Sequence, residues 1–343
     1  PELSRGLGDV YKRQFHGLIG RMHLLKRALK MPKVLIADSI SDIVCDIFEK
    51  NNIGYKKKTG LTEDELALEV KEYEGLLVRS AVTVTKKIID SAIKLKVIGR
   101  PGVGVDNVDL VAAKEKNVVV MNTPLGNVQA TAELTFGIIH SLMRKIQIAN
   151  VSMHSKKWEK KNFIGHELCG KTIGIVGFGN IGKKVSEFAR AYGMKIVVFS
   201  SSISEDEQNL YQVTNMNFEK LIQESDIVTF HNKLSDKSKY IINSSVLNKM
   251  KPSAIIINCA RGGRVNESEI KQSLLNKSLG GYGCDVYETE PQIDSIFAGM
   301  DNVVMTPHIG ASTVEAQEKV AVQIANQVSD YLLNNNLVNQ VNI

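Results

Sequence analysis

The chain has 343 residues, 43% of them hydrophobic and 23% charged, which is typical of a globular protein large enough for two domains and excludes a disordered or fibrous chain. The formal net charge is +6, but residues 1–30 hold seven Lys/Arg against two Asp/Glu, so the rest of the chain is nearly neutral and no nucleic-acid partner is expected. No apolar run approaches the roughly 18 residues of a membrane helix, and the four cysteines form no C-x-x-C pair, so we predict a soluble cytoplasmic protein with no membrane contact and no metal site.

Residues 1–30 look foreign to the fold. Residues 4–14, SRGLGDVYKRQ, resemble one reading frame of a sequencing adapter, and residues 15–30 are basic and free of acidic side chains. A transit peptide is the functional interpretation of this second stretch, but translated upstream sequence is the interpretation we favour beside an adapter. We therefore expect residues 1–30 to be a non-native leader and the natural protein to start at Met31.

From Met31 onward, short apolar strands alternate with helical segments. Strands are predicted at 34–36, 76–78, 97–98 and 118–120, with a helix at 42–49. A longer helix follows at about 129–145, and its only glycine is Gly137. This alternation predicts a parallel sheet covered by helices on both faces.

A second alternating unit begins after Trp158. Its strands are predicted at 172–176, 195–199, 227–230, 254–257, 281–285 and 303–305, with a helix from the glycine-rich turn to about Arg190 and a last helix at 314–333. Without a low-complexity linker, the domain boundaries are expected in loops near Pro124 and His308.

The segment GFGNIG at 177–182 is a G-x-G-x-x-G motif between a predicted strand and a predicted helix. Gly177 allows the tight turn, Gly179 lets a pyrophosphate approach the backbone, and Gly182 lets helix and strand pack closely. A glycine motif alone is weak evidence for a dinucleotide site. The strand before it and the helix after it make an ordinary glycine-rich turn the less favoured alternative. We predict a dinucleotide site.

An acidic residue that binds the ribose hydroxyls of NAD is expected about 20 residues further on. That position is Ser200, followed by two more serines. A serine does not repel a 2′-phosphate as a carboxylate does, so NADP stays open as a cofactor beside NAD, which we favour.

Three polar residues follow later strands, where doubly wound folds place their ligands. Arg261 offers paired donors to a carboxylate, His308 is a proton carrier near neutral pH, and Glu290 is a carboxylate that would stabilise its imidazolium. Singly, a histidine or glutamate is more often structural than catalytic, and a surface salt bridge would explain Arg261. Together with Asp285 after a neighbouring strand, they indicate a catalytic site.

Seven motifs carry a resemblance to a known family: VRS at 78–80, GRPGVGVDN at 99–107, NTP at 122–124, the glycine motif, NCARGG at 258–263, DVY at 285–287 and HIGASTVEAQ at 308–317. Over residues 31–343 the chain resembles the D-isomer-specific 2-hydroxyacid dehydrogenases, and the last motif, with KWEKKNF at 157–163, resembles the branch of that family that acts on 3-phosphoglycerate. The resemblance implies an α/β fold of two doubly wound parallel-sheet domains. A Rossmann-type NAD(P)-binding domain, 124–309, is inserted in a flavodoxin-like substrate domain, 31–123 and 310–343, and a dimer arm lies near 145–170.

The resemblance also implies residue roles. His308 is the acid and base, Glu290 its partner, and Arg261 binds the substrate carboxylate and orients the C2 oxygen, while Asp285 holds the nicotinamide carboxamide. The implied cofactor-binding residues are Gly177, Gly179, Asn180, Ile181, Gly182, Ser200, Asn232, Lys233, Cys259, Ala260, Arg261, Asp285, His308, Gly310 and Ala311.

The expected substrate-binding residues are Arg79, Ser80, Arg100, Val103, Gly104, Asn127 and Lys160, the last contributed by the arm of a neighbouring subunit. Two arginines and an amide suit a distal phosphate. The structural alternative for the lysines near Trp158 is a solvated surface.

The chain departs from the family pattern at three places: Ser200 replaces an Asp, Asn232-Lys233 replaces a Thr-Pro pair, and Val103 stands where threonine is common. Lys233 could reach a 2′-phosphate, which favours relaxed or NADP-leaning cofactor use. No C-terminal regulatory domain, and hence no feedback by serine through one, is expected.

We therefore expect a homodimeric dehydrogenase that converts 3-phosphoglycerate to 3-phosphohydroxypyruvate with NAD(P), at the start of serine biosynthesis. One alternative is a reductase of glyoxylate or hydroxypyruvate, or another D-2-hydroxyacid dehydrogenase. A second is a non-catalytic, nucleotide-sensing corepressor on the same fold.

Overall fold

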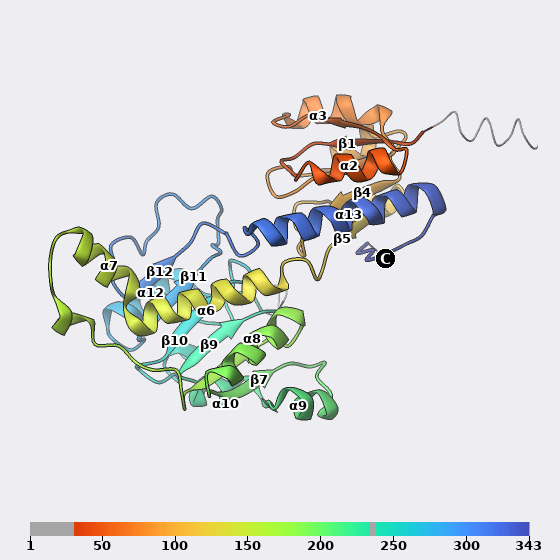
Figure 1. The fold of residues 1–343 in the computed structure, drawn as a ribbon. Coiled ribbons are helices and arrows are strands. Elements are labelled where there is room, and N and C mark those ends of the chain that lie inside the picture. Colours follow the sequence, from red (N-terminus) through yellow and green to blue (C-terminus); the bar gives the residue numbers. More distant parts are fainter. Residues whose placement is uncertain (1–30, 233–237, 343) are drawn as a thin grey trace, which may run out of the picture. The chain divides into compact units, whose positions relative to one another are not determined.

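The computed structural model describes residues 31–232 and 238–342 of the chain. The expectations for the leader, 1–30, and for Lys233 lie outside the described residues. The chain divides into two compact units, one running through Gly126 and resuming at Gln317, the other comprising Asn127–Ala316. Each unit holds one parallel β-sheet (Figure 1). None of the helices in the described ranges combines the length and the apolarity that a bilayer-spanning segment requires.

The first unit holds a five-stranded sheet in the order β2-β1-β3-β4-β5, every neighbouring pair being parallel. The strands are β1 (Lys33–Ile36), β2 (Gly54–Lys57), β3 (Gly75–Leu77), β4 (Val97–Arg100) and β5 (Val119–Asn122). The helices are α2 (Ile43–Lys50), α3 (Glu63–Glu69), α4 (Lys86–Ser91), α5 (Leu110–Glu115) and α13 (Val314–Asn334), with a 3-10 turn at Val70–Glu72. This strand order confirms the flavodoxin-like prediction.

The two faces of this sheet explain its strand sequences. Val34 and Ile36 pack on α2 and α13, whereas Leu35, between them, packs on α3, α4 and α5. Because successive side chains of a strand point to opposite faces, a strand covered on both sides reads as a continuous apolar run. Thr62 begins α3 with a capping box, since its side chain accepts from the N–H of Glu65 and Glu65 bonds back.

The second unit holds a seven-stranded parallel sheet in the order β12-β11-β10-β9-β6-β7-β8. Its strands are β6 (Thr172–Val176), β7 (Lys195–Phe199), β8 (Thr214–Asn215), β9 (Ile227–Phe230), β10 (Ile255–Asn258), β11 (Gly281–Cys284) and β12 (Val303–Met305). The first strand of the unit lies inside the sheet, with β7 and β8 on one side and β9 to β12 on the other. This is the Rossmann order, and it confirms the predicted fold class.

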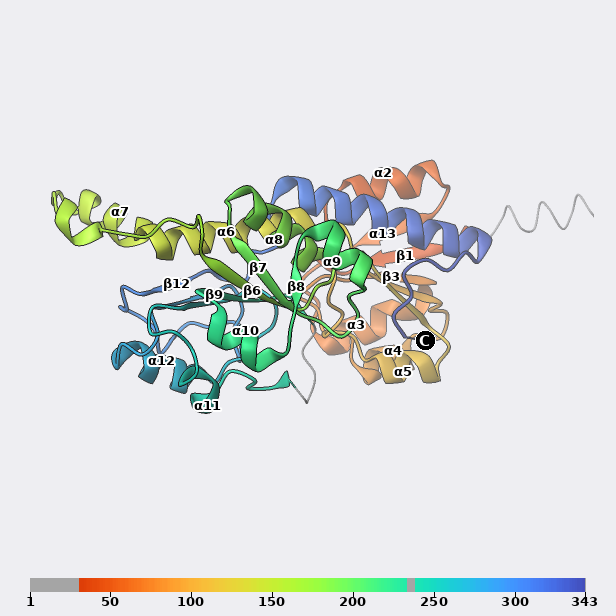
Figure 2. The same cartoon turned by 90° about the horizontal axis from the view of Figure 1, so that it is seen from below.

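Helices cover both faces of the seven-stranded sheet. The helices of this unit are α6 (Val128–Arg144), α7 (Ile146–His154), α8 (Asn180–Ala191), α9 (Glu205–Tyr211), α10 (Phe218–Glu224), α11 (Ser244–Leu247) and α12 (Glu267–Leu275), with a 3-10 turn at Lys160–Phe163. Helices α6 and α8 share one apolar core, and α10, α11 and α12 share the core of the other face. Figure 2 shows α7 and the chain after it extending past this sheet.

The boundaries between the units differ by a few residues from the expected ones. The first lies after Gly126 rather than after Thr123, and the second after Ala316 rather than after Ile309. Residues near Gly310 remain with the second unit because Thr131 Oγ1 donates to the Gly310 carbonyl and the Gly310 N–H donates to Asp285. We also did not predict β2 and β8, which are polar edge strands.

Candidate active site

The glycine motif forms the turn between β6 and α8. Gly177 has φ +96°, and a Cβ there would lie 2.6 Å from the backbone nitrogen of Asn232, so both conformation and space require glycine. Gly179 precedes α8 with no side-chain cap, and a Cβ on it would meet no atom within 4 Å. Free amides at a helix N-terminus beside open space fit the pyrophosphate of a dinucleotide. Asn180 and Ile181 are the first two residues of that helix.

Gly182 is the third residue of α8 and lets the helix pack closely against the glycine-rich loop that precedes it. A Cβ there would lie 2.3 Å from the carbonyl oxygen of Gly177. Any larger residue would push α8 away from the strand, so the third glycine of the motif serves packing, as its spacing predicts.

Hydroxyls, not a carboxylate, follow strand β7. The Ser200 N–H donates to Asn215 Oδ1 at 3.2 Å, and Asn215 Nδ2 donates back to the Ser200 carbonyl at 3.2 Å. The Ser200 hydroxyl lies 3.4 Å from the hydroxyl of Ser202 and accepts from the Ser202 N–H at 3.4 Å. The strand end thus offers no charge that would repel a phosphate on the adenosine ribose.

His308 and Glu290 form the central pair of the site. His308 Nδ1 lies 2.6 Å from Glu290 Oε2, and the other carboxylate oxygen accepts from the Tyr287 N–H at 3.0 Å. The His308 side chain is half exposed, at 50%, so it can meet a molecule from solvent. Its φ of +52° is a left-handed conformation that costs a non-glycine residue free energy and is held here by its neighbours.

The electrostatics of this pair suit proton transfer. The hydrogen bond to Glu290, and then its negative charge, raise the pKa of His308 despite partial burial. Burial raises the pKa of Glu290, but the hydrogen bonds from His308 and the Tyr287 N–H outweigh it and leave the net pKa lowered. The carboxylate therefore remains charged and favours the imidazolium form of His308.

Asp285 holds the loop that carries His308. It is 1% exposed, and its Oδ1 accepts from Thr306 Oγ1 at 2.7 Å and from the Ile309 N–H at 2.7 Å, while Oδ2 accepts from the Gly310 N–H at 2.8 Å. Burial raises the pKa of Asp285, and these three donors oppose the shift. In the structure this carboxylate therefore accepts hydrogen bonds from residues of the His308 loop. Ala311 follows in the same loop.

Arg261 lies in the loop after β10, and its charge acts on both members of the pair. It lowers the pKa of Glu290 and of His308, as a nearby cation does. Buried Asn258 shapes the loop, because its Nδ2 donates to the Arg261 carbonyl at 2.9 Å and its Oδ1 accepts from the Ala260 N–H at 3.2 Å. Cys259 is buried, which raises the pKa of its thiol to about 12 and makes it an unreactive wall of the site.

In the first unit, two side chains clamp the loop of Arg79 and Ser80. Asp38, 5% exposed after β1, accepts from the Arg79 N–H at 2.9 Å and the Ala81 N–H at 3.0 Å. Asn107 Nδ2 donates to the Arg79 carbonyl at 2.6 Å. This loop is therefore fixed in place while Ser80 remains exposed.

Arg100 ends β4 in the same unit and folds back on the following turn. A Cβ on Gly102 would lie within 1.8 Å of Arg100 Nη1, so the guanidinium lies directly against that backbone. The Val103 carbonyl accepts from Asn122 Nδ2 at 2.6 Å, and Gly104 follows at the surface of the turn. Arg79 and Arg100 thus lie at the carboxyl ends of adjacent strands, β3 and β4.

Two predicted substrate residues belong to the second unit. Asn127 precedes α6, and its buried Oδ1 has no hydrogen-bond partner among the described residues. Lys160 lies exposed in the 3-10 turn of the arm, in a segment distinct from the loops of Arg261, Glu290 and His308.

Comparison with known proteins decides the family. Residues 136–310 match the model of the D-isomer specific 2-hydroxyacid dehydrogenase NAD-binding domain. The chain belongs to this family. Two relatives named D-3-phosphoglycerate dehydrogenase, from Synechocystis and Bacillus subtilis, are 42% and 40% identical over 90% and 88% of this chain. The chain spans only 56% and 57% of their lengths.

Among solved structures, the TT0316 protein from Thermus thermophilus has a TM-score of 0.83 and 29% identity, covering 90% of this chain and 99% of that one. The match extends over both sheets. As a member of this dehydrogenase family, the chain carries the nicotinamide-cofactor domain that its glycine motif predicts.

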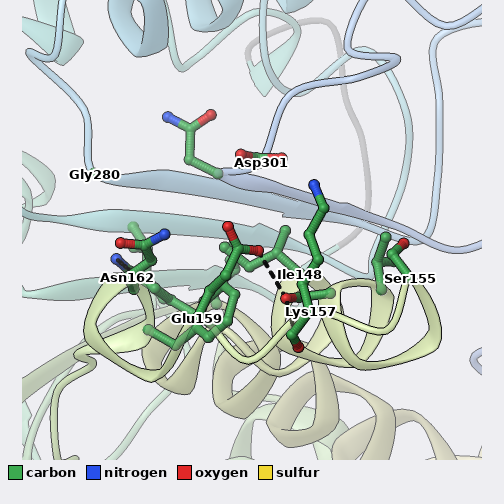
Figure 3. A pocket seen from close by; sticks show the side chains of 14 residues that line it. Ile148, Ser155, Lys157, Glu159, Asn162, Gly280 and Asp301 are labelled. Carbon is green, nitrogen blue, oxygen red and sulfur yellow. Dashed lines mark hydrogen bonds between the residues drawn. The ribbon is translucent and has the colours of Figure 1, made fainter.

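A separate cavity of about 610 Å³ lies in the arm of the second unit (Figure 3). Its walls include Ile148, Ser155 and Lys157 of the arm and Gly280 and Asp301 beside the sheet. No member of the His308, Glu290 and Arg261 group lines it. The side chain of Glu159 also lines this cavity, and its Oε2 accepts a hydrogen bond from Ser152 Oγ at 2.8 Å.

The sequence did not reveal Thr131 and Thr306 as supports of the His308 loop in the second unit, or Asp38 and Asn107 as supports of the Arg79 loop in the first. Each acts on a loop through hydrogen bonds, and its partners lie 21 to 179 residues away in the chain. Two of them gave a signal, since Thr306 directly follows β12 and Asp38 lies two residues after β1, near strand ends as the predicted ligands are.

Proposed function

We propose that this protein is a D-3-phosphoglycerate dehydrogenase, which oxidises 3-phosphoglycerate at C2 to 3-phosphohydroxypyruvate and so begins serine biosynthesis. The proposal is carried by the 2.6 Å pair of His308 and Glu290, with Arg261 acting on both. The two relatives of that name, 42% and 40% identical, support the choice of substrate.

A bound nicotinamide supplies the redox chemistry, as acceptor or donor of the hydride at C2. His308 takes the hydroxyl proton of the substrate in oxidation and returns it in reduction, through Nε2, since Nδ1 is engaged with Glu290. Glu290 stabilises the imidazolium that forms. Arg261 binds the substrate carboxylate with its forked donors and stabilises negative charge on the C2 oxygen.

Arg79 and Arg100 are proposed to bind the distal phosphate, with Ser80, Val103, Gly104 and Asn127 around the substrate. The fixed loop of Arg79 and the adjacent end of β4 support this role. A phosphate carries about two charges, which suits two guanidinium groups.

The test compares Arg79→Ala and Arg100→Ala on 3-phosphohydroxypyruvate and on glyoxylate, which has no phosphate. Each variant should lower kcat/KM for the phosphorylated substrate by about 100-fold, since a charge-assisted bidentate bond contributes about 3 kcal/mol, and for glyoxylate by less than about threefold. Lys116→Ala, an exposed cation of the same unit, is the control. Equal losses of kcat/KM on both substrates would contradict phosphate binding by Arg79 and Arg100 and favour a glyoxylate or hydroxypyruvate reductase. No turnover of any 2-hydroxy or 2-oxo acid would favour a nucleotide sensor.

For the cofactor we propose NAD(H) with tolerance of NADP(H). The hydroxyls of Ser200 and its neighbours, in place of a carboxylate, support this tolerance. A kcat/KM with NADPH more than about 100-fold below that with NADH would contradict it.

We propose that the protein is a homodimer joined through the arm. Val151, Trp158 and Ile164 of this segment are large apolar side chains that are 63%, 80% and 77% exposed, and the arm's cavity offers a surface for a second copy (Figure 3). Lys160 would then contribute its charge to the partner's site. Light scattering that gives the mass of one chain would contradict this.

The proposed setting is the cytoplasm. Cys45, Cys169, Cys259 and Cys284 are all free thiols in the structure, which is the usual state of cysteines in a reducing compartment.

A further inference from the structure

Arg264 is the largest fully buried side chain among the described residues, with 0% exposure. It follows Gly263 in the loop between β10 and α12, and its backbone is fixed by the Ile242 N–H, which donates to the Arg264 carbonyl at 3.2 Å. A guanidinium at such a position is unusual, because charged side chains are almost never fully buried unless they are paired.

The charge of Arg264 is not neutralised within the described residues. Its Nη2 donates to the Asn232 carbonyl at 2.5 Å, while Nε and Nη1 have no hydrogen-bond partner there. Burial, and then repulsion from Arg261, lower its pKa to about 10, so it remains a cation at neutral pH. Burial, and then Arg264, lower the pKa of the neighbouring His231 to about 3, so that ring is neutral and adds no second positive charge beside Arg264.

Among the described residues, the hydrogen bond made by the Arg264 guanidinium leads directly to the glycine motif. Asn232, whose carbonyl it holds, follows β9, and the Asn232 backbone packs so closely on Gly177 that a Cβ there would lie 2.6 Å from the Asn232 nitrogen. Arg264 therefore lies behind the segment that supports the first turn of the phosphate loop. An uncompensated cation in a low-dielectric environment attracts an anion far more strongly than one in water.

We propose that Arg264 is a cofactor-positioning residue that provides buried positive charge for the pyrophosphate of the nicotinamide cofactor and fixes the Asn232 segment against the phosphate loop. This role rests on the proposed cofactor and is independent of the substrate. It explains why a group that destabilises the fold by its burial is present at this place.

The test uses the whole protein and two probes, ADP, which carries a pyrophosphate, and adenosine, which does not. Calorimetry should show that Arg264→Met weakens ADP and NADH binding about tenfold and changes adenosine binding less than twofold, because only the first two carry the anion. Arg264→Lys keeps the charge and should retain most of the ADP affinity, whereas the neutral Arg264→Gln should lose it.

Thermal unfolding separates this role from a structural one. Without ligand, Arg264→Met should melt at or above the wild-type temperature, because an apolar side chain of similar volume replaces a buried charge that has no ion-pair partner among the described residues. Its stabilisation by NADH should be smaller than that of the wild type. If Arg264→Met fails to fold, the ADP affinities of Arg264→Lys and Arg264→Gln test the role of the charge instead.

Unchanged ADP affinity in the neutral variants, or equal losses for ADP and adenosine, would overturn the role of Arg264. A wild type that binds neither NADH nor ADP would overturn the proposed cofactor as well. A wild type that binds NADH but reduces no phosphorylated 2-oxo acid would contradict only the proposed substrate.

Discussion

At the scale of residues, the site depends on one side chain raising the proton affinity of another. Glu290 bonds His308 Nδ1 at 2.6 Å and raises its pKa, so the imidazolium persists to higher pH than in an isolated histidine. In the proposed reaction, reduction requires this protonated form as the acid, and oxidation requires the neutral form as the base. The same pair therefore sets opposite pH limits for the two directions.

Glu290→Gln removes the charge that raises the pKa of His308. The alkaline limb of kcat/KM for reduction should then move to lower pH, because the imidazole loses its proton earlier, and the rate at the optimum should fall about 100-fold. Steady-state pH profiles measure both effects. Glu288→Gln, a carboxamide in the same turn, is the control and should leave the limb in place. If the alkaline limb of Glu290→Gln lies at the same pH as that of the wild type, Glu290 does not control the protonation of His308.

At the scale of elements, the packing of α13 on the five-stranded sheet depends on a glycine as well as on apolar side chains. In β4, a Cβ on Gly99 would lie 2.5 Å from Leu77 Cδ2 and 2.9 Å from Ile324 and Val328 of α13. Gly99 therefore lets α13 approach the five-stranded sheet closely. Gly137 in α6 differs, because a Cβ there would meet no atom within 4 Å.

Gly99→Ala should destabilise the protein by about 1–3 kcal/mol, since the added methyl overpacks the contact between α13 and the sheet. Gly137→Ala is the matched control and should stabilise it by about 0.5–1 kcal/mol, because alanine favours an exposed helix position. Urea unfolding of both variants measures the difference. Destabilisation by Gly137→Ala, or none by Gly99→Ala, would contradict this account of the packing.

Most strands could be predicted from the sequence because they are buried on both faces and read as apolar runs, such as TIGIV in β6. The sequence GYKK in β2 could not, because it forms an edge strand that is half exposed and carries two lysines. The helix predicted to about residue 145 ends at Arg144, where Lys145 takes a left-handed conformation before α7. That break has no proline or glycine to signal it.

The candidate site was predictable where a polar residue lies close after the end of a strand, as Asp285 does directly after β11 and Arg261 does three residues after β10. It was not predictable where a side chain acts at long range in sequence. Thr131 reaches Gly310 across 179 residues. Arg264 was missed because an arginine after two glycines suggests a solvated loop, whereas packing buries it completely.

At the scale of the whole molecule, one unit with flavodoxin-like strand order is interrupted by a second with Rossmann order. The second unit carries the glycine motif and the His308, Glu290 and Arg261 group, while the first carries Arg79 and Arg100. Under the proposed function, this division assigns the reaction type to the second unit and the choice of substrate to the first. Substitutions at Arg79 should therefore change specificity and leave cofactor binding unaffected.

The most direct test of the proposed function is the ratio of kcat/KM for 3-phosphohydroxypyruvate to that for hydroxypyruvate, measured with NADH on the wild-type protein. The two substrates differ only in the phosphate. If Arg79 and Arg100 bind it, the ratio should exceed about 100, which corresponds to the roughly 3 kcal/mol expected of a charge-assisted contact. A ratio near or below one would contradict the assignment to 3-phosphoglycerate and leave a dehydrogenase of unphosphorylated 2-hydroxy acids.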